Sequence, residues 1–319
     1  MNKKTVAVVF GGQVNRANSC EAASSVIERL SVDKYEVIPL FLNDELHSFM
    51  YDGPAENIKN IAWERVGTSA ILSPDPRHHG LLRIVGDKLR PLRLDAVFPV
   101  FTGGCIAGKI QSICELAGLP FVGASQAAYS VFNNPIFMKK YISSLKINTL
   151  EQLTISGNEI FEHKQEILKN VRYKIGYPCL VQVFSPDASF VCGERAVLDR
   201  LLEDLAGQRP FPAITIQKHA ENRIYSCAVL SSGSELITSF GCEPEIGEKI
   251  REASVKIAKS ILGKGYGVAH FYFESERPVF IAFETSPLLT AAGDFFSLLS
   301  CTGIEMSRAL DIMIQTSAK

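Results

Sequence analysis

The side chains of this chain that are best suited to chemistry are a scattered set of cations. The basic candidates for contact with an anionic ligand are Arg16, Lys109, Lys139, Lys140, Lys218 and Arg223. We expect the adjacent Lys139 and Lys140 on a solvated helix face, because charge pairs usually lie there. These cations do not combine with carboxylates into an evident catalytic set, and spacing alone supports neither a Ser-His-Asp nor a Cys-His arrangement.

Cysteine and histidine spacing does not predict a metal site. The eight cysteines include no CxxC pair and no Cys/His pair at zinc spacing. Several lie inside apolar stretches, such as Cys179 in YPCLVQV and Cys227 in YSCAVLS, and we expect buried free thiols in a reducing compartment. His78 and His79 are adjacent and so point apart, which favours surface-loop histidines over chelation.

Composition indicates a protein large enough for two or three domains. The chain has 319 residues, and 33 basic against 34 acidic residues give a net charge of −1. This balance predicts no general attraction to nucleic acid or to an anionic membrane. Since no apolar run could span a bilayer and the N-terminus shows no cleavage signature, we expect a cytoplasmic protein.

Strands and helices alternate along the chain. Asp95–Gly123 reads as a buried strand (Ala96–Phe101), a Gly-rich turn, a helix (Gly108–Leu116) and a short strand ending at Gly123. Such a βαβ unit holds a ligand at the carboxyl end of a strand. Further strands are expected at Thr5–Phe10, Tyr35–Leu42, Pro178–Phe184, Ile214–Lys218, Tyr225–Ser231, Glu235–Phe240, Val268–Glu274 and Pro278–Glu284, and around Gln152. Helices are expected at Cys20–Leu30, Glu159–Asn170 and Glu245–Leu262, and from Ser125, Pro135 and Gly303, whereas Asn43–Pro91 reads as irregular.

Several segments resemble the D-alanine–D-alanine ligase family of ATP-grasp enzymes. They are VAVVFGG, DAVFPVF, IQSICELAGLPFVG, IGYPCLV, SCAVL and IREASVKIAKSILG, and SAILSPDPRHHGLL is similar to vancomycin-resistance-type ligases. The resemblance covers essentially the whole chain. It implies an α/β fold with an N-terminal βαβ, Rossmann-like domain (residues 1–131), followed by the central (132–216) and C-terminal (217–319) subdomains of an ATP-grasp fold.

The positions that match the family's nucleotide site have changed type. The family's MDK motif, with a phosphate lysine, reads Asn133-Asn134-Pro135 here. In the KPARxGSSxGV motif the lysine becomes Gln182, both loop glycines are lost and Ser189 survives. The matching positions for ATP are thus Gln182, Ser189, Gln217 and Lys218, the last two on a strand that in the family meets adenine through backbone atoms.

The positions that match the metal and substrate sites have changed as well. The family's RVD motif reads His270-Phe271-Tyr272, and its ExN magnesium motif reads Ala282-Phe283-Glu284, which leaves Glu284 as the one candidate metal ligand. The matching substrate positions are Gly12, Arg16 and Thr290. Arg16 replaces a glutamate, Thr102, Ile106 and Ala107 replace a histidine and an acidic pair, and no lid loop separates Phe240 from Pro244. The resemblance therefore supplies no catalytic residue.

These changes favour a degenerate ligase homologue that is catalytically inactive, a pseudoenzyme with a binding, regulatory or partner role. An active D-Ala–D-Ala-type ligase of peptidoglycan precursor synthesis with a rearranged site is one alternative. A structural subunit that pairs with a true ligase is another, and the chain could form a homodimer or a heterodimer. We expect no cofactor, or ATP and Mg²⁺ if the site functions, and neither a nucleic-acid nor a membrane partner.

Overall fold

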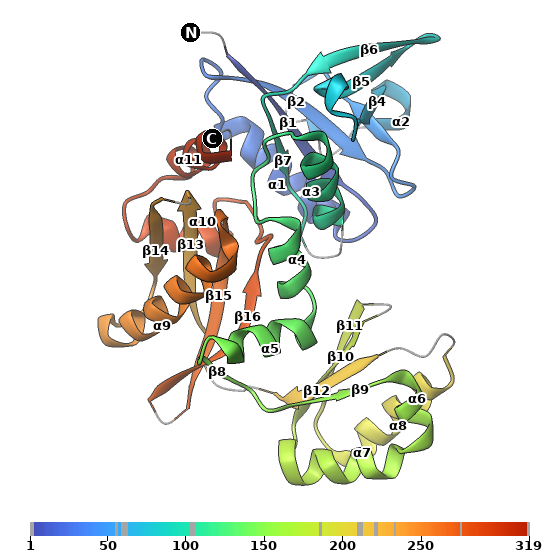
Figure 1. Ribbon diagram of the computed structural model, residues 1–319, viewed down its shortest axis with the longest axis vertical. Helices are drawn as coiled ribbons and strands as arrows, with labels where there is room; N and C mark the ends of the chain where they lie inside the picture. The colour runs from blue at the N-terminus through green and yellow to red at the C-terminus, as the bar shows by residue number, and fades with distance from the viewer. Residues whose placement is uncertain are drawn as a thin grey trace. The chain divides into compact units, whose positions relative to one another are not determined.

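The fold is described from a computed structural model of the chain (Figure 1). It describes residues 3–54, 57–58, 63–102, 106–184, 187–208, 213–219, 223–232, 234–274 and 276–317. The chain divides into two compact units. The first unit comprises Met1–Ser130, Tyr225–Ala269 and Phe283–Lys319, and the second comprises Val131–Ile224 and His270–Ala282.

The first unit contains a seven-stranded sheet with the order β6-β5-β4-β3-β2-β1-β7. Its strands are β1 (Lys4–Gly11), β2 (Tyr35–Leu42), β3 (Ser48–Met50), β4 (Thr68–Leu72), β5 (Gly80–Val85), β6 (Lys88–Arg93) and β7 (Ala96–Pro99). Strand β1 pairs in parallel with β2 and β7, with Lys4 opposite Tyr35 and Val6 opposite Ala96. The remaining pairs, from β2–β3 to β5–β6, are antiparallel.

Strand β1 is a continuous apolar run because both of its faces are covered. Alternate side chains point to opposite faces of a strand. Val6, Val8 and Phe10 belong to a core shared with α1 (Arg16–Arg29) and α11 (Met306–Ser317). Ala7 and Val9 belong to a second core, shared with α3 (Ile106–Ala117).

The prediction that residues 43–91 are irregular is wrong. This stretch contains β3, β4, β5, most of β6, the short helix α2 (Trp63–Val66) and a 3₁₀ turn, η2 (Pro76–His78). Its strands are short and carry glycine, proline and charged residues, so they lack a clear sequence period. They form because each finds an antiparallel neighbour. Conversely, the strand expected to end at Gly123 is reduced to a single bridge between Phe121 and Val97.

Most other predicted elements are confirmed to within a few residues. The remaining described helices are α4 (Gln126–Phe132), α5 (Pro135–Ser144), α6 (Gly157–Glu162), α7 (Lys164–Asn170), α8 (Arg195–Ala206), α9 (Pro244–Ile257) and α10 (Asp294–Ser300), with π-helical segments η3 (Val171–Ile175) and η4 (Ala258–Leu262). Neither α8 nor α10 was predicted. Within the described residues, none of the helices is long and apolar enough to cross a membrane.

Two further sheets complete the described fold (Figure 1). A four-stranded antiparallel sheet in the second unit has the order β11-β10-β12-β9. Its strands are β9 (Gln152–Ile155), β10 (Cys179–Phe184), β11 (Asp187–Cys192) and β12 (Ile214–Lys218). A five-stranded sheet has the order β14-β13-β15-β16-β8, with strands β8 (Asn148–Thr149), β13 (Tyr225–Ser232), β14 (Leu236–Phe240), β15 (Lys264–Glu274) and β16 (Arg277–Glu284).

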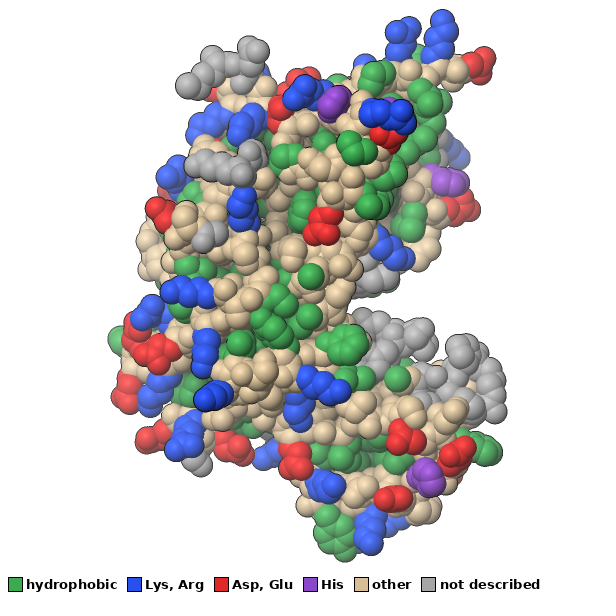
Figure 2. All heavy atoms as spheres, in the orientation of Figure 1, with side chains coloured by type: hydrophobic (Ala, Val, Ile, Leu, Met, Phe, Trp, Pro, Cys, Tyr) green, Lys and Arg blue, Asp and Glu red, His purple; other side chains and the backbone are tan. Residues whose placement is uncertain are grey.

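Acidic and basic side chains are interspersed over the face of the molecule shown in Figure 2. This distribution agrees with the net charge of −1. Five cysteines are buried free thiols, as expected: Cys20, Cys114, Cys179, Cys192 and Cys227. Cys242 is partly buried and Cys301 is exposed, while Cys105 lies outside the described residues.

Candidate functional site

Gly12 lies in the turn after β1 and packs against the first residue of α3. Its backbone φ of +83° is a conformation that residues other than glycine rarely adopt. A Cβ at this position would lie 2.5 Å from Ile106 Cδ1. Ile106 is buried and stands where the resemblance places an acidic residue. An aliphatic side chain therefore fills the space beside Gly12.

Arg16, the first residue of α1, is engaged by its own unit. Its Nη1 lies 3.6 Å from Asp44 Oδ1, and its guanidinium carbon lies 4.7 Å from the centre of the Phe41 ring. The side chain of the preceding residue, Asn15, donates to the carbonyl of Thr102 at 3.0 Å. Burial raises the pKa of the nearby Cys20 thiol, and the Arg16 charge opposes that rise. The start of α1 thus carries a positive charge that Asp44 and the Phe41 ring hold in place.

Pro135 begins α5, and Asn134 caps it. The Asn134 side-chain oxygen accepts hydrogen bonds from the backbone N–H groups of Ile136 at 3.0 Å and Phe137 at 3.2 Å. These are among the first-turn donors that otherwise suit an anion. Proline adds neither a charge nor a backbone donor. The stretch that matches the MDK motif therefore forms a capped helix N-terminus, in which Asn134 already occupies two of the first-turn N–H donors.

Lys139, one turn further along α5, differs from the expectation. It is partly buried, whereas Lys140 is exposed. Burial lowers the pKa of Lys139, and Glu151 partly offsets this effect. The prediction that both lysines lie on a solvated face is correct for Lys140 and wrong for Lys139, because adjacent residues on a helix point in different directions.

The hairpin of β10 and β11 brings two of the predicted nucleotide positions together. Gln182 lies directly opposite Ser189 on β11 and Thr215 on β12. The Thr215 hydroxyl donates to Gln182 Oε1 at 3.5 Å. Gln182 is partly buried and Ser189 is exposed. The altered glycine loop of the motif, residues 187–191, lies in strand β11, and the preceding Ser185 and Pro186 lie outside the described residues.

Gln217 and Lys218 end strand β12. Gln217 is opposite Leu180 on one side and Gln152 on the other. Lys218 Nζ lies 3.7 Å from Glu274 Oε1, and both side chains are more than half exposed. Lys218 is therefore one half of a solvated ion pair, which contributes little to stability.

Tyr272 takes the position of the family's magnesium aspartate and lies in an apolar environment. It is 3% exposed and packs with Leu150, Val279 and Ile281. Burial raises the pKa of its hydroxyl, and the charge of Glu274 adds to this rise. The position carries an aromatic ring in a small core instead of a carboxylate.

The remaining predicted site residues, Glu284 and Thr290, both lie in the C-terminal segment of the first unit, Phe283–Lys319. Glu284 is the exposed last residue of β16. Thr290 is buried, and its carbonyl accepts a hydrogen bond from the Gly293 amide at 3.0 Å. Within the residues that the structure describes, no group of three or more His, Cys, Asp or Glu side chains could hold a metal ion.

The predicted site residues are divided between the two units. Gly12, Arg16, Glu284 and Thr290 belong to the first, and Gln182, Ser189, Gln217 and Lys218 belong to the second. Sequence reasoning missed the cap at Asn134, although asparagine before a proline at the first helical position is a recognisable signal. It also missed Asp44 and Phe41, for which the sequence offers no signal.

The connection between β14 and α9 is as short as the sequence predicts. The strand ends at Phe240 and the helix begins at Pro244, so three residues join them. Gly247 lies tightly against Phe240, and a Cβ there would come within 1.9 Å of the Phe240 ring. Helix α9 thus packs directly on β14, which leaves no insertion that could act as a lid.

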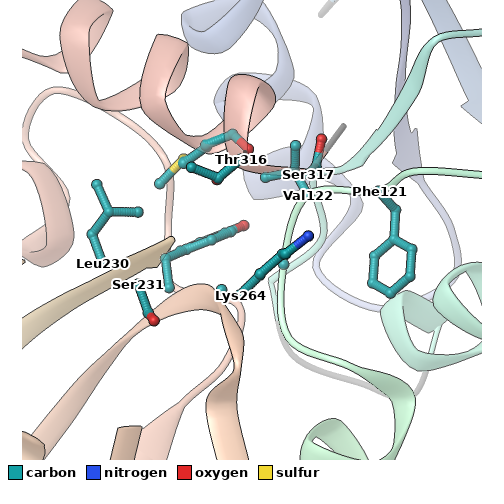
Figure 3. A pocket seen from close by; sticks show the side chains of 11 residues that line it. Phe121, Val122, Leu230, Ser231, Lys264, Thr316 and Ser317 are labelled. Atoms are coloured by element: carbon teal, nitrogen blue, oxygen red, sulfur yellow. Dashed lines mark hydrogen bonds between the residues drawn. The ribbon is translucent and has the colours of Figure 1, made fainter. Parts of the chain in front are cut away.

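Three hollows among the described residues are lined by residues other than the predicted site residues. One, in the first unit, is drawn in Figure 3, where the Lys264 side chain points into the space below Ser317 of α11. A neighbouring hollow of about 440 Å³ also includes Phe121, Lys264 and Ser317. A third, of about 170 Å³, is lined by Glu159, His163 and Glu166 in the second unit. None of the three includes a residue matched to the ligase site.

Comparison with solved structures defines the class of fold. The VanG D-Ala:D-Ser ligase of Enterococcus faecalis superposes with a TM-score of 0.85 at 23% identity, covering 99% of this chain and 100% of that one. The D-alanine–D-alanine ligase of Coxiella burnetii also gives 0.85, at 18% identity, with 99% and 95% covered. The chain therefore has the mixed α/β fold of these ligases, an N-terminal domain followed by an ATP-grasp fold.

Sequence comparison finds the same ligases as relatives. The model of the D-Ala D-Ala ligase N-terminus matches residues 5–124. The D-alanine–D-alanine ligase of Caldicellulosiruptor bescii is 25% identical over 348 residues, covering 98% of this chain and 95% of the relative. A Thermoanaerobacter ligase is 30% identical over 184 residues, but this chain spans only about half of its length (51%). The chain is therefore similar to D-alanine–D-alanine ligases over almost its whole length, and its residues 5–124 match the N-terminal model of that family.

Proposed function

We propose that this protein is a degenerate D-alanine–D-alanine ligase homologue without ligase activity, which acts through binding, regulation or a partner. The observation that carries the proposal is the environment of Arg16. A substrate ammonium would meet a positive charge there, and Asp44 and Phe41 hold that charge in place. Like charges at close range repel, so the site disfavours the substrate that the family resemblance implies.

The nucleotide positions support the same conclusion. Formation of an acyl phosphate requires cations and Mg²⁺ around the triphosphate. Pro135 and Gln182 supply no charge, Tyr272 lies in an apolar cluster, and Lys218 is paired with Glu274. We expect ATP to bind no more tightly than about 1 mM, and adenosine about as well as ATP. Backbone contacts from the strand of Gln217 and Lys218 would supply what adenine affinity remains.

Titration calorimetry with MgATP, ADP and adenosine tests nucleotide binding. Equal and weak affinities support the proposal. A low-micromolar dissociation constant for ATP that is lost on removal of magnesium would contradict it and favour an active ligase with a rearranged site. In that case Glu284 would be the first residue to substitute, because it is the candidate metal ligand.

ADP release with D-alanine, D-serine or D-lactate tests catalysis. We expect rates equal to a no-enzyme control for the unmodified chain, and also for Pro135→Lys, Gln182→Lys and Tyr272→Asp, alone or combined. Groups that act as a unit are strongly non-additive, so restoring single residues restores nothing. Turnover by the unmodified protein with any of these substrates overturns the proposal.

The proposal extends to location, organisation and partners. We place the protein in the cytoplasm and divide it into domains at residues 1–131, 132–216 and 217–319. We further propose that it forms a homodimer, or a heterodimer with a true ligase. Light scattering of the purified chain, alone and mixed with an active D-alanine–D-alanine ligase, distinguishes these assemblies. A monomer in both experiments would remove the subunit role and leave the binding role.

A further inference from the structure

Two buried cysteines face each other at the open end of the β10–β11 hairpin. Cys179 is the first residue of β10, Cys192 is the last residue of β11, and the register places them directly opposite. Directly opposed residues in antiparallel strands have Cα atoms about 4.5–5.5 Å apart. Disulfides span Cα separations of roughly 4.4–6.8 Å. The register therefore places the two Cα atoms in the range of separations that a disulfide can span.

The side chains point into the same core. Both cysteines are 0% exposed and belong to the core cluster that includes Val181, Leu198 and Ile216. Both thiols are free. Burial raises the pKa of both, to about 12 for Cys179, while the hydrogen bond between the two thiols lowers the pKa of Cys192. Cys192 is thus the thiol whose anion its neighbour stabilises.

We propose that Cys179 and Cys192 are a modification site, at which a hydroperoxide converts the two thiols into a reversible disulfide. Among the strands that the structure describes, β11 is at the edge of its sheet and has β10 as its neighbour. Its residues Phe190 and Val191 are 41% and 52% exposed. Edge strands with exposed side chains open locally at a lower free energy than central strands do. Such opening admits a small oxidant to thiols that the closed hairpin shields.

The chemistry balances with a hydroperoxide as the co-reactant. With hydrogen peroxide, the Cys192 thiolate attacks one peroxide oxygen, the O–O bond breaks, and the released hydroxide takes up the thiol proton to become water. Cys192 is then a sulfenic acid. The Cys179 sulfur attacks the Cys192 sulfur, the S–S bond forms, and the S–OH bond breaks with loss of a second water, which takes the Cys179 proton. The two sulfur atoms lose two electrons, which reduce the peroxide.

The disulfide would fix the hairpin that carries Gln182 and Ser189. It would tie the first residue of β10 to the last residue of β11, so the edge strand could no longer separate from its neighbour. This inference does not rest on the proposed function, because it needs only the register and the packing of the second unit. Any ligand that requires β11 to open would lose access in the oxidised protein.

Mass spectrometry of the full chain under non-reducing conditions tests the site. After treatment with hydrogen peroxide we expect a mass lower by two hydrogen atoms, a peptide that links Cys179 to Cys192, and reversal by dithiothreitol. Hydrogen exchange of the β10 and β11 amides should slow by at least about tenfold in the oxidised protein. Unchanged exchange, or failure to form the link at all, would overturn the proposal.

Two variants control the assignment. Cys192→Ala should abolish the link, whereas Cys114→Ala, which removes a buried thiol from the first unit, should leave it intact. If Cys192→Ala does not fold, the peptide map of the unmodified chain decides alone. Oxidation confined to the exposed Cys301, or a link from either cysteine to Cys242, would show that the opposed pair is not the reactive site.

Discussion

Replacing Arg16 by glutamate would restore the residue type that the family resemblance implies, and we expect it to destabilise this protein without creating a substrate site. Three effects act in the same direction. The ion pair with Asp44 is lost, the contact with the Phe41 ring is lost, and two carboxylates face each other where a cation and a carboxylate stood. The contacts within the first unit therefore favour an arginine at this position.

The structure sets the size of the effect. The Arg16 and Asp44 side chains are 40% and 68% exposed, so their ion pair is worth about 0.2–1 kcal/mol. The cation over the Phe41 ring adds about 0.5–1 kcal/mol. Repulsion between the new carboxylate and Asp44 is of similar size to the lost attraction. The free energy of unfolding should fall by roughly 1–3 kcal/mol, and by less at high salt because the charges are solvated.

Fluorescence of Trp63 reports the unfolding of this unit directly. It is the one tryptophan of the chain, it is 1% exposed, and its ring stacks on Phe41 at 5.0 Å between centroids. Urea titrations of the unmodified chain and of Arg16→Glu give the difference in unfolding free energy. Added D-alanine should leave both curves unchanged.

A charge-swapped partner separates the contributions. Arg16→Glu combined with Asp44→Arg restores an ion pair but not the contact with Phe41, so it should recover about half of the lost stability. Full stability of Arg16→Glu at low salt would refute the assigned contacts. Stabilisation of this variant by D-alanine would show that one residue had excluded the substrate, contrary to the proposed loss of the whole site.

Three further outcomes follow from particular contacts. The Asp311 carboxylate accepts hydrogen bonds from Tyr35 and from Lys34 (2.9 Å), which together hold its pKa below the usual value although burial alone would raise it. The ionised Asp311 therefore stabilises the fold fully above about pH 4, and this stabilisation is lost as the pH falls through the lowered pKa of the folded protein. In urea titrations between about pH 5 and about pH 3, the free energy of unfolding should therefore fall less for Asp311→Asn than for the unmodified chain. Tyr272→Asp should lower the free energy of unfolding by about 3–5 kcal/mol, measured by circular dichroism, whereas Tyr272→Phe should lower it by less than about 1.5 kcal/mol. Equal losses for the two variants would contradict the apolar cluster around Tyr272. Asn134→Ala should cost about 0.5–2 kcal/mol and speed hydrogen exchange in the first turn of α5, and unchanged exchange would contradict the cap.

Much of the scaffold could be predicted from the sequence because its signals are local. Strand β2 begins and ends at the predicted residues, Tyr35 and Leu42. Buried parallel strands carry unbroken apolar runs, and glycine turns mark their ends. The same local segments carry the resemblance to the ligase family, which the comparisons confirm.

The environment of each site residue was decided by tertiary structure. Arg16 meets Asp44 only because β1 and β2 are neighbours in the sheet, and Tyr272 meets Leu150 only through packing of segments more than 100 residues apart in sequence. The four strands within residues 43–93 likewise depend on pairing partners that no local period announces. The sequence alone determined which of the charged groups typical of the ligases this chain lacks. Only the folded chain determined what occupies their places, because contacts between distant residues are set by pairing and packing rather than by the local pattern.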